Sequence, residues 1–514
     1  MKKKTKALPN DVELLKKMLL EQAEKLERKL AQKDKRIAKL EQVNQQLEDK
    51  LQRLLEQYNL EQHKKFSPSS ESYEGEGEVL NEAEQLADAA QAEPETAKSK
   101  QAAKPRRPRI AAELPRVEVI HDIADKTCAC CGHALHKIGE EVSEQVEFVP
   151  AQIRVLKNIR PKYSCRQCEA EQTEVAIQIA EVPPAIIPKS MATPSLLAQI
   201  ISGKMHYGMP LYRQEKLFLQ AGIELSRQTM SRWLIRGADK LEPLLALMKA
   251  ELLKQPVLWA DETTVNVLDV DKSNCYMWVY GCGQESSTGP KLVLFDYQDG
   301  RSGDHPKAYL ANYSGYLQVD GYAGYEQTDA TLVGCWAHAR RKFVEAQKAQ
   351  AKGKTGKADW AIHHIRKLYA LESELKTQSA DIKYQQRQER AKPLLKQLWD
   401  WLEKSKETVS KESLLGKAIT YSQNQWPKLE QYLEDGRLTI DNNRAERAIK
   451  PFVIGRKAWL FANTTSGAKA SAALYSLVET AKINGLEPYE YLCRLLAELP
   501  KVTDNEQLQK LLPY

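Results

Sequence analysis

The 514-residue sequence has no uninterrupted apolar run of about 18 residues, the length that a membrane-spanning helix needs. Its basic start, Met1–Lys6, leads into charged sequence instead of an apolar segment, so we expect no secretory signal. Cysteine is scarce, with nine residues, an odd number that argues against a framework of disulfides. No internal repeat is evident. These absences predict a multidomain protein of a reducing cytoplasm, with no contact to a membrane.

Charge is unevenly distributed along the chain. The net charge of +7, from 76 basic and 69 acidic residues, is by itself weak evidence for a nucleic-acid partner. However, residues 71–95 contain nine acidic and no basic side chains, and residues 98–109 contain six basic and no acidic ones. We interpret residues 66–115 as a disordered linker whose basic end either follows a DNA backbone or is simply solvated.

An apolar heptad repeat runs from Leu19 to Tyr58 within a segment, residues 10–63, that reads as one long helix that Asn10 would cap. Asn44 occupies an a position, where a buried amide favours two strands in register. The pattern predicts a coiled coil over residues 1–65 that joins copies of the chain into a homo-oligomer. A solvated single helix, or one folded back on the body, is the alternative.

Two CxxC pairs predict a structural zinc site. The candidate ligands are Cys128, Cys131, Cys165 and Cys168. Strand-like sequence separates the two pairs, and four thiolates suit a closed tetrahedral site, a zinc ribbon, with no position left for substrate. Cys130 lies inside the first pair, so whether Cys130 or Cys131 binds zinc stays open at this point.

A helix-turn-helix motif is predicted after the cysteine region. Residues 211–220 read as a helix, residues 221–223 as a turn that needs Gly222, and Ser226 as the cap of a second helix extending to Arg236. Four side chains would face outward near the start of this second helix: Arg227, Gln228, Ser231 and Arg232. These residue types suit phosphates and base edges, although an ordinary helical hairpin would show the same pattern.

Two acids sit at strand-like segments 59 residues apart (320 − 261). Asp261 lies inside the strand-like run 256–265, and Asp320 ends another at 315–321, with two strands and a short helix predicted between them. This order matches the first half of an RNase H-like fold, in which the first and fourth strands are neighbours. Glu446, on a later helix that Asp441 would cap, supplies a third carboxylate. Three such groups suit two Mg²⁺ ions, with Mn²⁺ as an alternative, in phosphodiester chemistry.

The predicted fold class is therefore multidomain, with an α/β RNase H-like catalytic core interrupted by a helical insertion. The expected boundaries are coiled coil, 1–65; linker, 66–115; zinc ribbon, 116–182; helix-turn-helix domain, 183–250; first part of the core, 251–350; helical insertion, 351–436; closing helix of the core, 437–470; and C-terminal helical segment, 471–514.

Several separate motifs resemble those of the large transposase subunit of insertion-sequence family sixty-six, a family of bacterial DDE transposases. The motifs in the expected core are Ala260-Asp261-Glu262-Thr263, Val319-Asp320-Gly321-Tyr322, Cys335-Trp336-Ala337-His338-Ala339-Arg340-Arg341-Lys342-Phe343 and Asp441-Asn442-Asn443-Arg444-Ala445-Glu446-Arg447. Others lie before the core, among them Arg160-Pro161-Lys162-Tyr163-Ser164-Cys165 and Tyr207-Gly208-Met209-Pro210-Leu211-Tyr212-Arg213. The resemblance extends from about Phe66 to the C-terminus.

The resemblance implies a DNA-strand transferase that uses Asp261, Asp320 and Glu446 as catalytic metal ligands. It implies binding to terminal inverted repeats through the zinc ribbon and the helix-turn-helix motif, joining of 3′ ends to target DNA, and two small accessory proteins of the same element as partners. We also expect Arg340 and Arg341 to contact the DNA backbone or to form a solvated helix face. His338 either orients a group at the site or is a structural histidine, the commoner case.

Three other readings remain at this stage. The chain could be a catalytically silent DNA-binding repressor derived from a transposase, an RNase H-like nuclease, or a scaffold that binds only proteins. Intact acids argue against the first, strand joining would exclude the second, and the placement of the acids argues against the third.

Overall fold

The computed structural model describes residues 12–66, 153–163, 178–272, 274–283, 289–350 and 356–514. Two compact units divide the chain, one made of Glu93–Val182 and the other of Met1–Ala92 with Pro183–Tyr514. In the smaller unit, β1 (Lys162–Tyr163) pairs with β2 (Gln178–Ile179) in antiparallel register. All five cysteines considered for zinc lie outside the described residues, as does Asn10, the expected first cap of the chain.

The predicted long helix is present as α1 (Val12–Phe66), which has 55 residues. Its apolar heptad positions face solvent in the single chain, since Leu26 is 62% exposed and Leu47 59% exposed. No described helix of this chain is both long and apolar enough to cross a bilayer.

Four short helices precede the sheet: α4 (Pro194–Met205), α5 (Leu211–Gln220), α6 (Arg227–Lys240) and α7 (Glu242–Leu252). The predicted turn between α5 and α6 is present. Gly222 adopts a φ of 85°, a conformation that would be strained for a residue with a side chain. Ser226 caps α6 as expected, because its hydroxyl accepts a hydrogen bond from the Thr229 amide at 3.3 Å. The second helix ends at Lys240, one turn later than the predicted Arg236.

Five strands form a mixed sheet in the order β5-β4-β3-β6-β7. They are β3 (Val257–Val265), β4 (Cys275–Cys282), β5 (Leu292–Gln298), β6 (Tyr316–Gln318) and β7 (Thr331–Val333). The first three pair antiparallel, whereas β3–β6 and β6–β7 pair in parallel. A short helix, α8 (Asp304–Tyr309), joins β5 to β6. The sequence prediction that the first and fourth strands are neighbours is confirmed.

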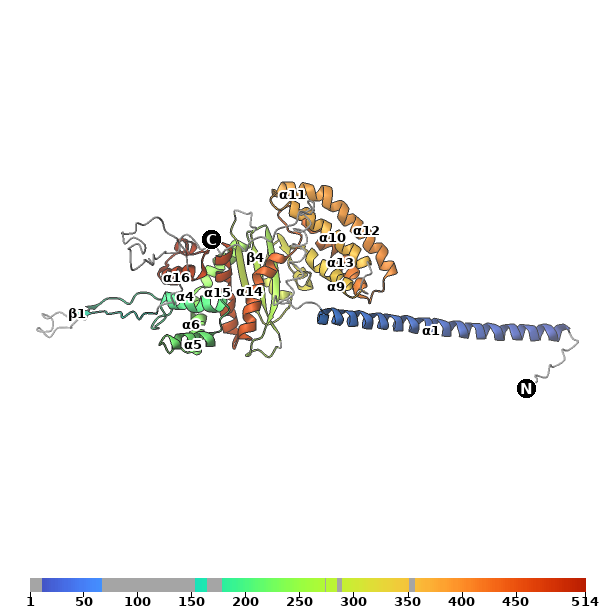
Figure 1. Cartoon of the computed structure of the whole chain (residues 1–514), viewed down its shortest axis with the longest axis horizontal. Helices are drawn as coiled ribbons and strands as arrows, with labels where there is room; N and C mark the ends of the chain where they lie inside the picture. Colours follow the sequence, from blue (N-terminus) through green and yellow to red (C-terminus); the bar gives the residue numbers. More distant parts are fainter. Residues whose placement is uncertain (1–11, 67–152, 164–177, 273, 284–288, 351–355) are drawn as a thin grey trace, which may run out of the picture. The chain divides into compact units, whose positions relative to one another are not determined.

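The structure has two apolar cores, one around the sheet and one among the helices that follow the sheet in the sequence. The chain continues through the 3₁₀ turn 323–327, α9 (Trp336–Lys348), α10 (Lys357–Glu374), α11 (Ala380–Gln386), the π turn 387–391, α12 (Lys392–Thr408), α13 (Leu414–Leu429) and the 3₁₀ turn 431–433. Figure 1 shows α10 to α13 grouped together. Helices α10, α12 and α13 share one apolar cluster with α9, which includes Trp336, Phe343 and Ile365. The predicted helical character of residues 357–435 is therefore present.

The C-terminal helices complete the sheet's own core. They are α14 (Asn443–Trp459), α15 (Thr465–Ile483), α16 (Pro488–Glu498), the 3₁₀ turn 499–501 and α17 (Asn505–Gln509). Helix α14 lies along the sheet in Figure 1, and α15 covers the edge strand β5. The Thr480 hydroxyl accepts from the Val293 amide at 3.1 Å and the Ser476 hydroxyl from the Phe295 amide at 2.8 Å. This edge therefore cannot pair with another strand.

Candidate active site

Asp261 and Asp320 occupy equivalent positions on neighbouring strands. In the parallel pair β3–β6, the last paired residues are Trp259 and Gln318. Two residues further along the chain from each are Asp261, inside β3, and Asp320, just beyond the end of β6. Adjacent strands are roughly 4.8 Å apart. The two carboxylates that the sequence predicted to meet therefore emerge from one level of the sheet.

Backbone amides hold both aspartates. The Glu262 amide donates to Asp261 Oδ1 at 2.8 Å, and the Tyr322 amide donates to Asp320 Oδ1 at 3.0 Å. The Tyr421 hydroxyl donates to the Asp320 carbonyl at 2.9 Å. Because Gly321 has a φ of 108°, the chain turns sharply after Asp320 in a way that favours glycine.

Glu446 reaches this region from the first turn of α14. The start of that helix is tied to β3, because Asn442 Nδ2 donates to the carbonyl of Ala260, the residue before Asp261, at 2.8 Å. The Asn442 amide also donates to Cys335 Sγ at 3.2 Å. One asparagine thus places the glutamate-bearing helix against the strand that carries Asp261.

The prediction that Asp441 caps α14 is wrong. Asn442 occupies the cap position, and Asp441 lies one residue further out. Asp441 Oδ1 accepts from the Asn443 amide at 3.2 Å and its Oδ2 from Asn443 Nδ2 at 3.0 Å. The side chain of Asn442 makes no capping hydrogen bond and instead contacts Ala260.

Negative charge is concentrated around Asp261. Burial raises the pKa of Asp261 well above its ordinary value, and Asp320, Glu262 and Glu446 raise it further in that order, against the opposing hydrogen bond from the Glu262 amide. The three predicted acids are therefore close enough to act on one another electrostatically. Such crowding of like charges is typical of sites that hold cations or exchange protons.

Two basic side chains of α9 lie beside Glu446. His338 Nε2 is 3.7 Å from Glu446 Oε1, and Arg341 Nη2 is 4.0 Å from the same oxygen. Burial, and then the Arg341 guanidinium, lower the pKa of His338 to about 4, so this imidazole is neutral at pH 7. Arg341 is the charged neighbour of Glu446. His338 thus lies at the site, which the sequence had left open.

The donors fit a hard divalent cation in chemistry, but they do not form a finished ligand cage. Within the described ranges, no three His, Cys, Asp or Glu side chains are arranged to hold a metal ion. Carboxylate oxygens are the ligands that Mg²⁺ prefers, and Mg²⁺ keeps several waters beside one or two carboxylates. Burial, and then the neighbouring carboxylates, raise the pKa of Asp261, and a bound cation would stabilise its charged form.

Glu262 is a buried carboxylate that the sequence analysis did not single out. Its side chain is 1% exposed and accepts from Arg301 Nε at 2.9 Å and from the Tyr325 hydroxyl at 2.6 Å. Neighbouring residues of a strand point to opposite faces, so Asp261 and Glu262 cannot share one role. The alternation of side chains along a strand is the feature of the sequence that could have separated Glu262 from Asp261.

The predicted DNA-contacting residues fall into three groups. Arg227, Gln228 and Arg232 on α6 are exposed, and Ser231 is half-buried. Arg341 has a side chain only 15% exposed that faces Glu446. Arg340 is 4% exposed, so the expectation that it contacts DNA is wrong: α9 packs this side of the helix against the insertion core.

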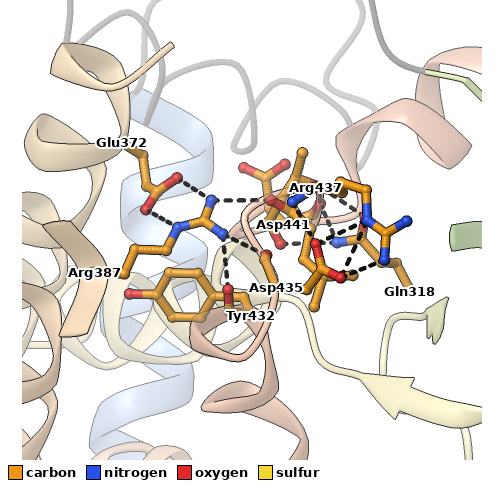
Figure 2. A network of polar contacts seen from close by, with 9 residues as sticks. Gln318, Glu372, Arg387, Tyr432, Asp435, Arg437 and Asp441 are labelled. Atoms are coloured by element: carbon orange, nitrogen blue, oxygen red, sulfur yellow. Dashed lines mark hydrogen bonds and ion pairs between the residues drawn. The ribbon is translucent and has the colours of Figure 1, made fainter. Parts of the chain in front are cut away.

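A polar network fixes the segment that leads into α14 (Figure 2). Arg387 donates to both oxygens of Glu372, at 2.9 and 2.6 Å, and to the carbonyls of Tyr432, Asp435 and Leu438 at 2.8 to 2.9 Å. From β6, Gln318 Nε2 donates to the Thr439 carbonyl at 2.8 Å. The insertion and the sheet therefore both anchor the chain just before Glu446.

Family models match most of this chain. The model described as "Transposase IS66 family" matches residues 189–470, more than half of the chain. "Zinc-finger binding domain of transposase IS66" matches 125–169, "IS66 C-terminal element" matches 476–514, and "Transposase C of IS166 homeodomain" matches 53–119.

Two curated proteins are similar to this chain over most of its length. The uncharacterized protein y4qI of Sinorhizobium fredii is 31% identical, over 99% of this chain and 97% of that protein. The uncharacterized protein y4jD of the same organism is 35% identical, over 78% of this chain and 80% of its own length. With an N-terminal helical region, a zinc-finger domain and a core of mixed sheet and helices, the chain belongs to the IS66 family of transposases.

Proposed function

We propose that this protein is a DDE-type DNA transposase. It binds the terminal inverted repeats of its element, cleaves DNA phosphodiester bonds and joins the 3′ ends to target DNA. The observation that carries this proposal is the placement of Asp261 and Asp320 at equivalent positions on β3 and β6, with Glu446 near enough to raise the pKa of Asp261.

The core is RNase H-like in this proposal. Support comes from the strand order β5-β4-β3-β6-β7, with three antiparallel strands followed by two parallel ones and a helix that returns to the central strand. Residues 351–436 are then an insertion between α9 and the closing helix. Their anchoring through Arg387 gives the insertion a role in positioning Glu446.

Asp261, Asp320 and Glu446 would hold two Mg²⁺ ions, or Mn²⁺, which supply an activated nucleophile and a stabilised leaving oxygen. Other residues of the chain would orient these ligands and contact the DNA. The amides of Glu262 and Tyr322 orient the two aspartates. Arg341 lies close enough to Glu446 to hold its carboxylate and to meet a DNA phosphate that arrives there. The neutral His338 keeps the wall of the site uncharged on its side.

DNA recognition is assigned to the two modules before the core. Arg227, Gln228, Ser231 and Arg232 would contact the terminal repeats from the start of α6. Cys128, Cys131, Cys165 and Cys168 would hold a structural zinc ion, with Cys130 as the competing ligand for the second position. The match to a zinc-finger model over residues 125–169 supports this part.

The remaining partners follow from the helix and the family. The exposed heptad face of α1 supports homo-oligomerisation through a coiled coil. Two small accessory proteins of the same element complete the proposed machinery, which would act on the nucleoid in the bacterial cytoplasm.

A Mg²⁺-dependent assay on DNA carrying the element's ends tests this function. The wild-type protein should nick the ends and join them to a second DNA molecule, and Asp320→Asn should do neither while still binding the ends. Nicking without joining would instead indicate a nuclease. Binding by the wild type with neither reaction would indicate a repressor.

A further inference from the structure

A cationic pocket lies beside the carboxylates, between the start of α14, the C-terminal part of α15 and the edge formed by β4 and β5. Its volume is about 380 Å³. Among the residues that the structure describes, Lys291, Arg444, Arg447 and Lys482 line it together with one carboxylate, Glu479. A lining rich in lysine and arginine side chains suits an anionic ligand.

Trp259 forms the inner wall of this pocket. Its indole lies across Gly281, its cross-strand partner, where a Cβ would come within 2.1 Å of the ring. The side chain is 3% exposed, and Nε1 finds no hydrogen-bond acceptor among the residues that the structure describes. A buried indole N–H normally has a partner, so this donor points to a ligand oxygen.

The lysines of the pocket are held in place by the packing of β5 on α15. Lys482 Nζ is 2.9 Å from both oxygens of Glu479, so this carboxylate is already paired. Asn484 Nδ2 donates to the Lys291 carbonyl at 2.7 Å, which fixes the backbone of Lys291 at the end of α15. Both lysines are therefore held by specific contacts.

The pocket is one short step from the proposed catalytic carboxylates. Trp259 and Asp261 lie on the same face of β3, two residues or roughly 7 Å apart. That step corresponds to about two nucleotide rises along a DNA strand. On α14, Arg444 and Arg447 are three residues apart on one side of the helix and flank Glu446 in sequence.

We propose that this pocket binds a backbone phosphate of the DNA strand, within about two nucleotides of the bond held at the carboxylates. Lys291 and the two arginines contact the phosphate, Lys482 stays paired with Glu479, and the Trp259 N–H donates to one of the phosphate oxygens. The pocket thereby positions the strand without touching the reacting atoms. This inference rests on the proposed function, because it needs DNA at Asp261 and Asp320.

The test measures binding of a short fluorescein-labelled single-stranded oligonucleotide to the full-length protein by anisotropy, without Mg²⁺, over a series of salt concentrations. Lys291→Gln should weaken binding roughly fivefold. It should also make the slope of log affinity against log salt shallower by about 0.7, the value for one phosphate contact on a single strand. Lys404→Gln, the same charge change at an exposed position of α12, is the matched control and should leave both quantities near wild type.

Trp259→Phe tests whether the indole N–H contributes to DNA binding separately from the positive charges of the pocket. It keeps a ring over Gly281 but removes the N–H, so affinity should fall roughly threefold while the salt slope stays unchanged, since no charge is lost. Equal effects of Lys291→Gln and Lys404→Gln, or wild-type affinity in a folded Trp259→Phe, would overturn the proposal. Should Trp259→Phe not fold, the two lysine variants decide. A wild-type chain that binds no DNA at all would instead refute the proposed function.

Discussion

At the residue scale, Asp261 is a carboxyl whose charged form is destabilised by its surroundings. Its backbone belongs to the central strand β3, so the carboxyl cannot move away from Asp320 without disturbing the sheet. Burial and three neighbouring carboxylates all raise its pKa. Residues that perform chemistry often oppose folding in this way, because selection acts on their function.

We therefore predict that Asp261→Asn abolishes DNA cleavage and at the same time stabilises the fold. In Mg²⁺-free buffer at pH 8, the amide removes a crowded charge, and the free energy of unfolding should rise on the order of 1 kcal/mol. Thermal unfolding of both proteins measures this difference. Asp304→Asn, the same substitution at an exposed position of α8, is the matched control and should give no comparable gain.

The stabilisation should depend on pH in one direction. A carboxyl whose pKa is raised in the folded state weakens the wild type as pH climbs from the unfolded-state pKa, about 3.9, through the raised folded value. The advantage of Asp261→Asn should thus be largest at pH 8 and should nearly vanish by about pH 3, where Asp261 is protonated in the folded state and largely so in the unfolded one. An advantage that grows toward low pH would contradict the electrostatic cause.

Two adjacent arginines show what residue type alone cannot predict. Arg340 and Arg341 are equally basic in the sequence, yet Arg340 is buried against the insertion and Arg341 lies 4.0 Å from Glu446. A helix turns about 100° per residue, so neighbours face different surroundings. Which one meets the site depends on the orientation of α9, and that is set by the insertion core around Trp336 and Phe343.

At the scale of elements, the position of α14 depends on the network around Arg387. This arginine is almost fully buried, and its planar fork spans Glu372 and three carbonyls of the segment before α14. Lysine offers no such geometry. The insertion is therefore a structural support for the catalytic helix as well as a separate core.

Arg387→Lys should destabilise the protein by about 3–5 kcal/mol, the cost of breaking a buried, hydrogen-bonded charge pair. Arg390→Lys, at an exposed pair with Glu374 one helical turn away, should change stability by less than about 0.5 kcal/mol. Urea unfolding of the two variants measures both values. Similar effects from the two substitutions would show that Arg387 does not hold the segment.

Elements with a strong local pattern could be predicted from the sequence. The bounds of α5 agree with the prediction, and the order of the strand-like segments indicated that β3 and β6 are neighbours. Contacts between distant residues could not be predicted in this way. The bond from Asn442 to Ala260 joins residues 182 positions apart, and the pairing of Glu262 with Arg301 depends on which face of β3 each acid occupies.

At the scale of the whole molecule, α1 presents an unpaired apolar stripe. Leu40 is 58% exposed and Leu47 59% exposed in the single chain. Contiguous exposed leucines at heptad spacing are stabilised by pairing with a second helix of the same kind. A dimer or higher oligomer would also bring together the two ends of a mobile element, as strand transfer requires.

Removing residues 1–60 should lower the oligomeric state, as measured by light scattering. Leu40→Asp combined with Leu47→Asp should have the same effect in the full-length chain, because the charges disrupt the a/d seam. Gln42→Asp combined with Gln46→Asp introduces the same charges on the outer face of the helix, away from the seam, and should leave the mass unchanged. An oligomeric state that is the same for all four proteins would exclude association through α1.

The shared divalent-ion site is the claim on which the catalytic account rests, and Mn²⁺ binding to the full-length protein, followed by electron paramagnetic resonance, tests it most directly. We predict that the wild-type protein binds Mn²⁺ and that Asp261→Asn, Asp320→Asn and Glu446→Gln each weaken this binding, because in the proposed site all three acids would contribute oxygens to the same ions. Wild-type Mn²⁺ binding in both aspartate variants would contradict the account.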